Sequence, residues 1–261
     1  MIVDIHTHIF PPRLIEARAR LADADPAFAE IYRDPKAKMA TAEDLLASMD
    51  AAGVDVSVAC GFWWRAPAVA AEHAAYLVQV AAVSGGRIVP FVPGVPVPGA
   101  AGLGEVREAD PARIEAGGLP LLVHASEEAG HAYPGKAGGL SPGGIWRLLE
   151  SQPAARVIAA HWGGGMPFFA LMPEVRAHIE AGRLIFDTAA SAYLYDPSVF
   201  RLGIALAGRQ AVAWGSDFPL RSQARDRAEV EAALPDEADR AAVLGGNAAR
   251  FLRLPAARAD A

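Results

Sequence analysis

Eight short apolar runs recur along the 261-residue chain, and a stretch with helical character follows most of them. Several runs are continuously apolar, as is typical of parallel strands that are covered on both faces. Strands that alternate with helices indicate βαβ units, and eight units in about 250 residues favour a closed α/β barrel of the TIM type, (β/α)8, over an open sheet. We therefore expect a single domain over residues 1–261. The predicted strands are residues 1–6, 54–61, 87–92, 103–108, 119–124, 155–161, 183–189 and 210–217.

The helical stretches carry clear start and stop signals. In residues 41–53, Thr41 is placed as an N-cap, Asp44 follows three residues later, and Gly53 stands at the end. Similar helical patterns occupy residues 71–86 and 174–182.

Two regions depart from the regular repeat. Residues 103–108 form a weak strand pattern, and residues 110–118 are too few for a full crossover helix. Residues 11–38 form a long excursion after the first strand, with a helical pattern over residues 14–24. In a barrel this excursion would lie over the mouth, so we expect it to act as a lid.

Composition excludes several classes of protein. A net charge of −6 and the absence of a lysine and arginine cluster argue against a nucleic-acid surface. The single cysteine, Cys60, cannot form an intrachain disulfide and suits a reducing cytoplasm. A signal peptide would not contain Asp4, His6 and His8, and no apolar stretch is long enough to span a bilayer. We expect a cytoplasmic protein with a small-molecule substrate and no membrane partner, in which residues 68–83 could mediate a homodimer.

The apolar runs repeatedly end in residues that bind metals, at the strand ends where barrel active sites are built. The residues at these positions are His6, His8, His124, His161 and Asp217. Residues i and i+2 of a strand point to the same side, roughly 6.6 Å apart, so His6 and His8 can converge on one ion. Imidazoles completed by a carboxylate suit zinc or another first-row metal, and an open position for water favours a catalytic site.

Asp4 lies on the same face of the first strand as these histidines, one step deeper in the barrel. Two interpretations stay open for it. It either orients a ligand histidine from behind, or it is a buried carboxylate with its own polar partners inside the barrel.

Residues 161–165 read His-Trp-Gly-Gly-Gly, a backbone that can turn sharply into the next helix because glycine allows positive φ. A glycine run before a helix can also bind anions. The lysine and serine of a phosphate loop are missing, so we predict a tight turn. The neighbouring and preceding aromatic side chains are expected mainly in the core, namely Trp63, Trp64, Trp162, Phe168 and Phe169.

The motifs together resemble a known family. Asp-Ile-His-Thr-His at residues 4–8, the later His124 and His161, and Gly-Ser-Asp-Phe-Pro at residues 215–219 are similar to the amidohydrolase superfamily, in particular its amidohydrolase-2 branch. That branch includes aminocarboxymuconate-semialdehyde decarboxylase. The resemblance covers essentially the whole chain, up to Gly-Gly-Asn-Ala-Ala-Arg-Phe-Leu at residues 245–252.

The resemblance implies a TIM barrel of the metal-dependent hydrolase type. It implies that His6, His8 and His124 bind a divalent metal, and that Asp217 is a further ligand or the base that takes a proton from the attacking water. His161 would be a second ligand, if the site is binuclear, or a catalytic acid and base. One or two ions are expected, with Zn²⁺ favoured over Mn²⁺ or Fe²⁺.

The fourth predicted strand brings in a further carboxylate. A carboxylated lysine bridges two metals in many amidohydrolases, but the three lysines here, Lys36, Lys38 and Lys136, lie at no predicted strand end. Some relatives, including the TatD-type deoxyribonucleases, place a ligating or bridging glutamate where Glu105 lies. The alternative is a solvated glutamate or one paired with Arg107.

Substrate contacts are expected from the loop at residues 124–136, which should overhang the mouth. Its candidates are His131, Tyr133 and Lys136. Glu127 and Glu128 could each contact the substrate or be solvated, and both interpretations stay open. Arg65 lies where the decarboxylase relatives use an arginine to grip the substrate carboxylate.

The leading hypothesis is a metal-dependent hydrolase that uses a metal-activated water on a small polar substrate such as an amide, lactone or ester. The alternative is a non-oxidative decarboxylase of the same branch. Less favoured are a TatD-like phosphodiester hydrolase, which Glu105 supports and the acidic composition opposes, and a metal-binding barrel without turnover.

Overall fold

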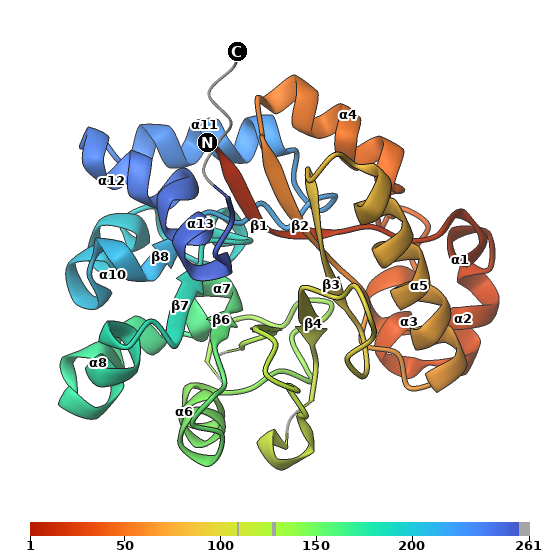
Figure 1. Cartoon of the computed structure of the whole chain (residues 1–261), viewed down its shortest axis with the longest axis horizontal. Helices are drawn as coiled ribbons and strands as arrows, with labels where there is room; N and C mark the ends of the chain where they lie inside the picture. Colours follow the sequence, from red (N-terminus) through yellow and green to blue (C-terminus); the bar gives the residue numbers. More distant parts are fainter. Residues whose placement is uncertain (109, 127–128, 256–261) are drawn as a thin grey trace.

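The eight strands form one parallel sheet in sequence order, wrapped by helices (Figure 1). The computed structural model describes residues 1–108, 110–126 and 129–255. Every neighbouring pair from β1 to β8 runs parallel, which confirms the α/β-barrel prediction. The strands are β1 (Val3–His8), β2 (Val56–Cys60), β3 (Ile88–Val92), β4 (Gly102–Val106), β5 (Leu121–Val123), β6 (Val157–Ala159), β7 (Leu184–Asp187) and β8 (Val212–Ala213).

The barrel closes between β8 and β1. Ile5 donates a backbone hydrogen bond to Trp214, with N and O 2.9 Å apart, and Thr7 forms a parallel bridge with Phe218. The last strand is shorter than residues 210–217 because the backbone N–H of Trp214 turns outward to the carbonyl of Val243. The residues after β8 are therefore free to bend over the end of the barrel.

Two apolar layers hold the barrel together. Strand side chains such as Ile5, Phe91 and Ile158 fill the interior, and a larger cluster lies between the strands and the outer helices. A Cβ at Gly102 would come within 2.4 Å of the Phe91 ring, so only glycine fits at the point where β4 passes this ring. Cys60 is buried in the inner cluster, as expected of a small hydrophobe.

The first outer helix begins and ends where the sequence places its signals, and the helices predicted over residues 71–86 and 174–182 lie at Pro67–Val83 and Pro173–Glu180. Thr41 and Asp44 form the capping box of α4, and Gly53 ends it in a left-handed conformation at φ 62°. Between β4 and β5 the described residues contain only the 3-10 turn η1, as the short segment predicted. The outer helices are α4 (Ala42–Ala52), α5 (Pro67–Val83), α6 (Pro142–Ser151), α8 (Pro173–Glu180), α10 (Val199–Ala207), α11 (Gln223–Ala233), α12 (Glu237–Ala241) and α13 (Asn247–Leu252). Two one-turn segments, α7 (Ala160–Gly163) and α9 (Ser191–Leu194), follow the ends of β6 and β7. Shorter turns are η1 (Pro111–Arg113), η2 (Met166–Leu171), η3 (Arg209–Ala211) and the π-turn η4 (Ala242–Gly246).

The excursion after β1 folds into three short helices, α1 (Pro12–Glu16), α2 (Arg18–Ala24) and α3 (Pro26–Tyr32), beside α5 (Figure 1). Asp25 caps α3 by accepting from the backbone N–H groups of Ala27 and Phe28. An aromatic cluster that includes Phe10, Phe28 and Trp64 packs these helices onto the strand ends. The helical part of the prediction is confirmed.

The segment after β6 turns tightly, as predicted. His161, Trp162 and the three glycines that follow all have positive φ. The prediction for two of the aromatic side chains was wrong: Phe168 is 65% exposed and Phe169 is 42% exposed. They lie on the outward side of η2, because this turn buries Met166 and Ala170 instead.

In the described part of the chain, none of the helices combines the length and apolar character needed to cross a membrane.

Candidate metal centre

Strand β1 brings two imidazoles together at its carboxyl end. The Nε2 atoms of His6 and His8 lie 3.0 Å apart. His6 is fully buried, and His8 is partly buried. The i, i+2 spacing therefore converges both rings on one point, as the sequence predicts.

The side chain of Asp217 reaches the same point from the segment after β8, the strand that closes the barrel against β1. Its backbone N–H donates to the carbonyl of His6 at 2.9 Å, and its φ of 58° turns the side chain back toward β1. Its Oδ1 lies 3.3 Å from Nε2 of His8 and 3.7 Å from Nε2 of His6. The three residues form a group whose ligand atoms all lie within 4.8 Å of one another.

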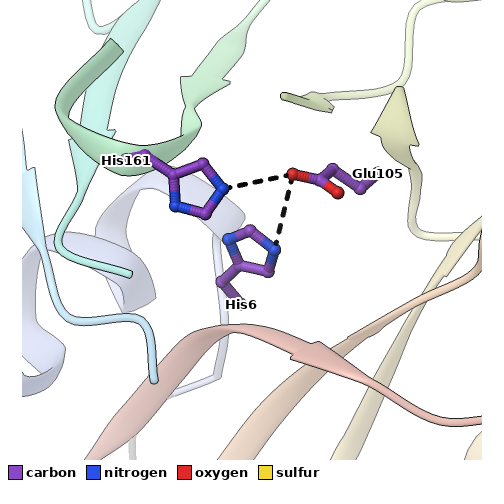
Figure 2. A group of neighbouring side chains, drawn as sticks. All are labelled: His6, Glu105 and His161. Carbon is purple, nitrogen blue, oxygen red and sulfur yellow. Dashed lines mark ion pairs between the residues drawn. The ribbon is translucent and has the colours of Figure 1, made fainter. Parts of the chain in front are cut away.

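A second group of possible metal ligands also contains His6. Figure 2 shows the side chains of His6, Glu105 and His161, from β1, β4 and the turn after β6, pointing toward one another. Glu105 Oε1 lies 3.8 Å from His6 Nε2 and 3.5 Å from His161 Nε2. The same oxygen lies 2.9 Å from Nδ1 of His124. The structure thus brings all five predicted strand-end residues and Glu105 into one cluster.

Glu105 also forms the ion pair that the sequence left as its alternative. Its Oε2 accepts from Nε and Nη2 of Arg107 at 3.1 and 3.0 Å. Nη1 of Arg107 donates to the carbonyl of Gly135 in the loop after β5. One carboxylate therefore faces histidines with one oxygen and a guanidinium with the other.

Asp187 is a functional residue that the sequence analysis missed. This side chain is fully buried at the end of β7, and its Oδ2 lies 2.8 Å from Nδ1 of His6, within hydrogen-bond distance. Its Oδ1 accepts from the backbone N–H of His161 at 2.8 Å. The signal was present, because the apolar residues 184–186 of a predicted strand are followed directly by this carboxylate. Asp187 fixes the ring of His6 so that Nε2 faces the cluster.

Asp4 follows the second of its two interpretations. Its carboxylate accepts from Ser216, Gln223 and the backbone N–H of His6, and does not touch an imidazole of the cluster. Burial raises the pKa of Asp4 to about 6, although these hydrogen bonds oppose the shift.

The electrostatics of the cluster favour a cation. Burial lowers the pKa of His6, but nearby carboxylates, first of all Asp187, outweigh burial and raise it to about 10. Burial disfavours the charged form of Glu105, but Arg107 and His124 hold its pKa well below the usual range. The pKa of Asp217 is also held below its usual range by His8 and His6, against the effect of burial. The negative potential that favours a proton on His6 would equally favour a metal ion in its place.

The donor set fits a divalent first-row ion. It consists of imidazole nitrogens and carboxylate oxygens, which zinc and manganese accept. Burial, with Arg107 next, lowers the pKa of His124 to about 4, so this imidazole is neutral as a ligand must be. Nε2 of His124 is buried without a hydrogen-bond partner among the described residues. A bound ion would account for this buried polar atom.

The cluster forms the floor of a cavity of about 570 Å³. The excursion after β1, residues 11–38, contributes Tyr32, Lys36 and Lys38 to its walls, and the loop after β5 contributes His131 and Tyr133. Phe62, Tyr193 and Leu220 add apolar surface, and Arg107 adds a cation that is only 14% exposed. The cavity lining is therefore mostly apolar by area, with charged side chains both at the floor and in the wall that residues 30–38 form.

Two predicted substrate contacts lie elsewhere. Arg65 is exposed and does not line the cavity, because the backbone around it is anchored to Asp25 and α5 begins directly afterwards. Lys136 is also absent from the lining, because its ammonium donates to the carbonyls of Ala129 and His131 within its own loop. Glu127 and Glu128 lie outside the described residues.

Comparison with known proteins identifies the family. A family model described as Amidohydrolase, of the amidohydrolase-2 type, matches residues 3–254. The chain belongs to the amidohydrolase-2 family. A search of curated proteins found no match.

Solved structures share the fold of this amidohydrolase-2 chain. 5-Carboxyvanillate decarboxylase from Sphingomonas paucimobilis is 17% identical over 97% of this chain and 99% of its own, with a TM-score of 0.71. The same enzyme from Novosphingobium aromaticivorans, complexed with manganese and 4-hydroxy-3-methoxy-5-nitrobenzoic acid, is 12% identical over 97% and 96% of the two chains, with a TM-score of 0.73. An amidohydrolase from Burkholderia multivorans with bound zinc is 17% identical over 98% and 100%, with a TM-score of 0.66. At these identities the likeness establishes the barrel fold.

Proposed function

We propose that the protein is a metal-dependent, non-oxidative decarboxylase of a small, largely apolar carboxylic acid, such as an aromatic acid. The observation that carries the proposal is the placement of the His6, His8 and Asp217 group at the floor of a mostly apolar cavity beside the half-buried guanidinium of Arg107. A flat ring with an acidic substituent matches this combination. The two structurally similar decarboxylases act, by name, on such an acid.

We assign His6, His8 and Asp217, together with His124, as the residues that hold one divalent ion. When bound, such an ion acts as a Lewis acid that orients and polarises oxygen atoms of the substrate. Asp187 keeps the proton of His6 on Nδ1, so that the lone pair of Nε2 stays available. Zn²⁺ and Mn²⁺ both suit this donor set.

Decarboxylation also needs a proton donor. The bond between the carboxyl group and its carbon breaks, carbon dioxide leaves, and the electron pair that remains on the carbon takes a proton. Burial lowers the pKa of His161, but the hydrogen bond to Glu105 and nearby carboxylates raise it overall, which favours the protonated imidazole. Nδ1 of His161 lies 3.1 Å from the carbonyl of Ala189, which leaves Nε2 facing the cluster. We assign Nε2 of His161 as the proton donor.

Hydrolysis is the second candidate, and one observation favours it. The Asp217 carboxylate stays ionised and lies 3.3 Å from His8 at the cavity floor, where it could accept a proton from an attacking water. The chemistry would then be that of an amidohydrolase, as the zinc-containing protein from Burkholderia multivorans is named.

Isotopes separate the two reactions. The protein is loaded with Zn²⁺ or Mn²⁺ and incubated with 5-carboxyvanillate, hydroxybenzoates, and simple lactones and amides. We expect carbon dioxide from an acid of the panel and, in D₂O, one deuterium on the carbon that lost it. Incorporation of ¹⁸O from labelled water into a lactone or amide product, without release of carbon dioxide, would refute decarboxylation. His161→Asn should abolish carbon dioxide release, whereas Arg65→Ala, outside the cavity, should match the wild type.

A further inference from the structure

We propose that the hydroxyl of Tyr32 donates a hydrogen bond to the carboxylate of the substrate acid. Tyr32 is the last residue of α3, so the excursion after β1 contributes a substrate-binding residue to the cavity. The inference rests on the proposed function, because a carboxylate is the one group that every substrate of a decarboxylase must carry.

The aromatic ring of Tyr32 is fixed by its neighbours. Its centroid lies 4.8 Å from that of Phe28, 5.2 Å from that of Phe10 and 6.1 Å from that of Phe62. The rings of Phe10 and Phe62 meet it edge to face, at interplanar angles of 76° and 77°. Aromatic rings at such separations and angles attract one another beyond the burial of their area. The ring is therefore already in place, and a ligand that contacts it does not have to immobilise it.

The hydroxyl is the unused part of this side chain. Tyr32 is 8% exposed, and its hydroxyl makes no hydrogen bond to any residue that the structure describes. A buried tyrosine usually pairs this group, as Tyr76 does by accepting from the backbone N–H of Ala42. The hydroxyl oxygen of Tyr32 is not sealed inside the protein, and the residue lines the cavity. A ligand in the cavity can therefore supply the missing acceptor.

The charges at the cavity floor keep this hydroxyl a donor. Burial raises the pKa of Tyr32 above its usual range, and the negative charge of Asp217 raises it further, while Arg107 opposes the shift. The phenol therefore keeps its proton at neutral pH and can give a hydrogen bond to an anionic oxygen. The effects of Asp217 and Arg107 also show that Tyr32 lies within electrostatic reach of the floor.

Arg107 leaves room for such a donor. Its Nε and Nη2 atoms lie 3.1 and 3.0 Å from Oε2 of Glu105, and its Nη1 donates to the carbonyl of Gly135 at 2.7 Å. All three nitrogens of the guanidinium therefore already have an acceptor. A carboxylate that is drawn into the cavity by this positive charge still needs a donor that is not engaged elsewhere, and the hydroxyl of Tyr32 is one.

Tyr32→Phe tests the inference because it removes the hydroxyl and keeps the ring. The variant should fold like the wild type, since the hydroxyl has no protein partner to lose. One probe is 4-hydroxy-3-methoxy-5-nitrobenzoic acid, with which the decarboxylase from Novosphingobium aromaticivorans is complexed, and the other is 2-methoxy-6-nitrophenol, the same molecule without its carboxyl group. Dissociation constants for Mn²⁺-loaded protein are measured from the absorbance of the nitrophenol. We expect the constant for the acid to rise about 10- to 100-fold, as is typical when a hydrogen bond to a charged group is lost, and the constant for the phenol to stay unchanged.

Tyr76→Phe is the matched control. It removes a hydroxyl that lies outside the cavity lining, so both dissociation constants should equal those of the wild type. An unchanged constant for the acid in Tyr32→Phe, or equal losses for the acid and the phenol, would overturn the inference and leave the proposed function standing. A wild type that binds the acid no more tightly than the phenol would overturn the inference and count against the proposed function as well. Release of carbon dioxide from the panel of acids tests the proposed function separately, so the two failures are distinguishable.

Discussion

Replacing Asp187 by asparagine should weaken metal binding although residue 187 touches no ion. Asp187 Oδ1 accepts two backbone hydrogen bonds, from His161 at 2.8 Å and from Ala189 at 3.0 Å. The asparagine oxygen must take this place, because its amide nitrogen cannot accept. The amide NH₂ then faces Nδ1 of His6, which Asp187 holds at 2.8 Å in the native protein. Two donors cannot pair, so the proton of His6 moves to Nε2 and removes the lone pair that the ion needs.

The expected cost is about 10- to 100-fold in metal affinity, as is typical when a partner that orients a ligand histidine is lost, or about 1.4 to 2.7 kcal/mol. The affinity for Zn²⁺ is measured at pH 7.5 by competition with a chromophoric chelator. Asp4→Asn, at a buried carboxylate that touches no imidazole of the cluster, is the matched control and should change the affinity little. A wild-type affinity in Asp187→Asn, with the fold retained, would refute the orientation argument.

Three further predictions concern stability and the cavity. Burial lowers the pKa of His73 to about 4 from its usual 6.5, and Nδ1 of His73 accepts from Trp64 while Nε2 lies 2.7 Å from the Ile9 carbonyl. Neutral His73 therefore stabilises the fold above pH 6.5, and this contribution to stability is lost as the pH falls toward 4. Urea titrations at pH 7 and pH 5 should show that the wild type loses about 2 kcal/mol more unfolding free energy over this range than His73→Gln does. Equal losses in the two proteins would contradict the prediction. Gly102→Ala should lower the unfolding free energy by about 1 to 3 kcal/mol, because its Cβ would lie 2.4 Å from the Phe91 ring, and an unchanged urea midpoint would argue against this close approach. Tyr32 lines the cavity and Arg65 does not, so Tyr32→Ala should raise KM for the acid that the protein decarboxylates by more than Arg65→Ala does. Equal changes in KM would place the substrate outside this cavity.

The main features of the barrel follow from the sequence because they depend on local pattern. Apolar runs covered on both faces give strands, and the ends of parallel strands meet at one face of a barrel. Histidines that end separate runs, such as His6, His124 and His161, are therefore brought together by topology alone. The capping box of α4 is equally local, since Thr41 and Asp44 bond only to each other's backbone and side chain.

Other features depend on where a side chain or backbone turns after the strand ends. Arg65 lies outside the cavity because its backbone is anchored to Asp25, which is forty residues away in the sequence. The role of Asp187 depends on β7 lying beside β6 and on the left-handed turn that begins at His161, neither of which the local sequence shows. Phe168 is exposed because η2 buries other residues, which its apolar sequence does not reveal.

The central claim is that one divalent ion lies at the cavity floor between β1 and the residues after β8. Crystals of the wild-type protein grown with Mn²⁺ or Zn²⁺ would test it through an anomalous difference map collected at the metal's absorption edge. The account predicts one peak per chain, with Nε2 of His6, His8 and His124 and a carboxylate oxygen of Asp217 each about 2.0 to 2.2 Å away. A peak bound by other residues, or no peak in metal-saturated crystals, would contradict it.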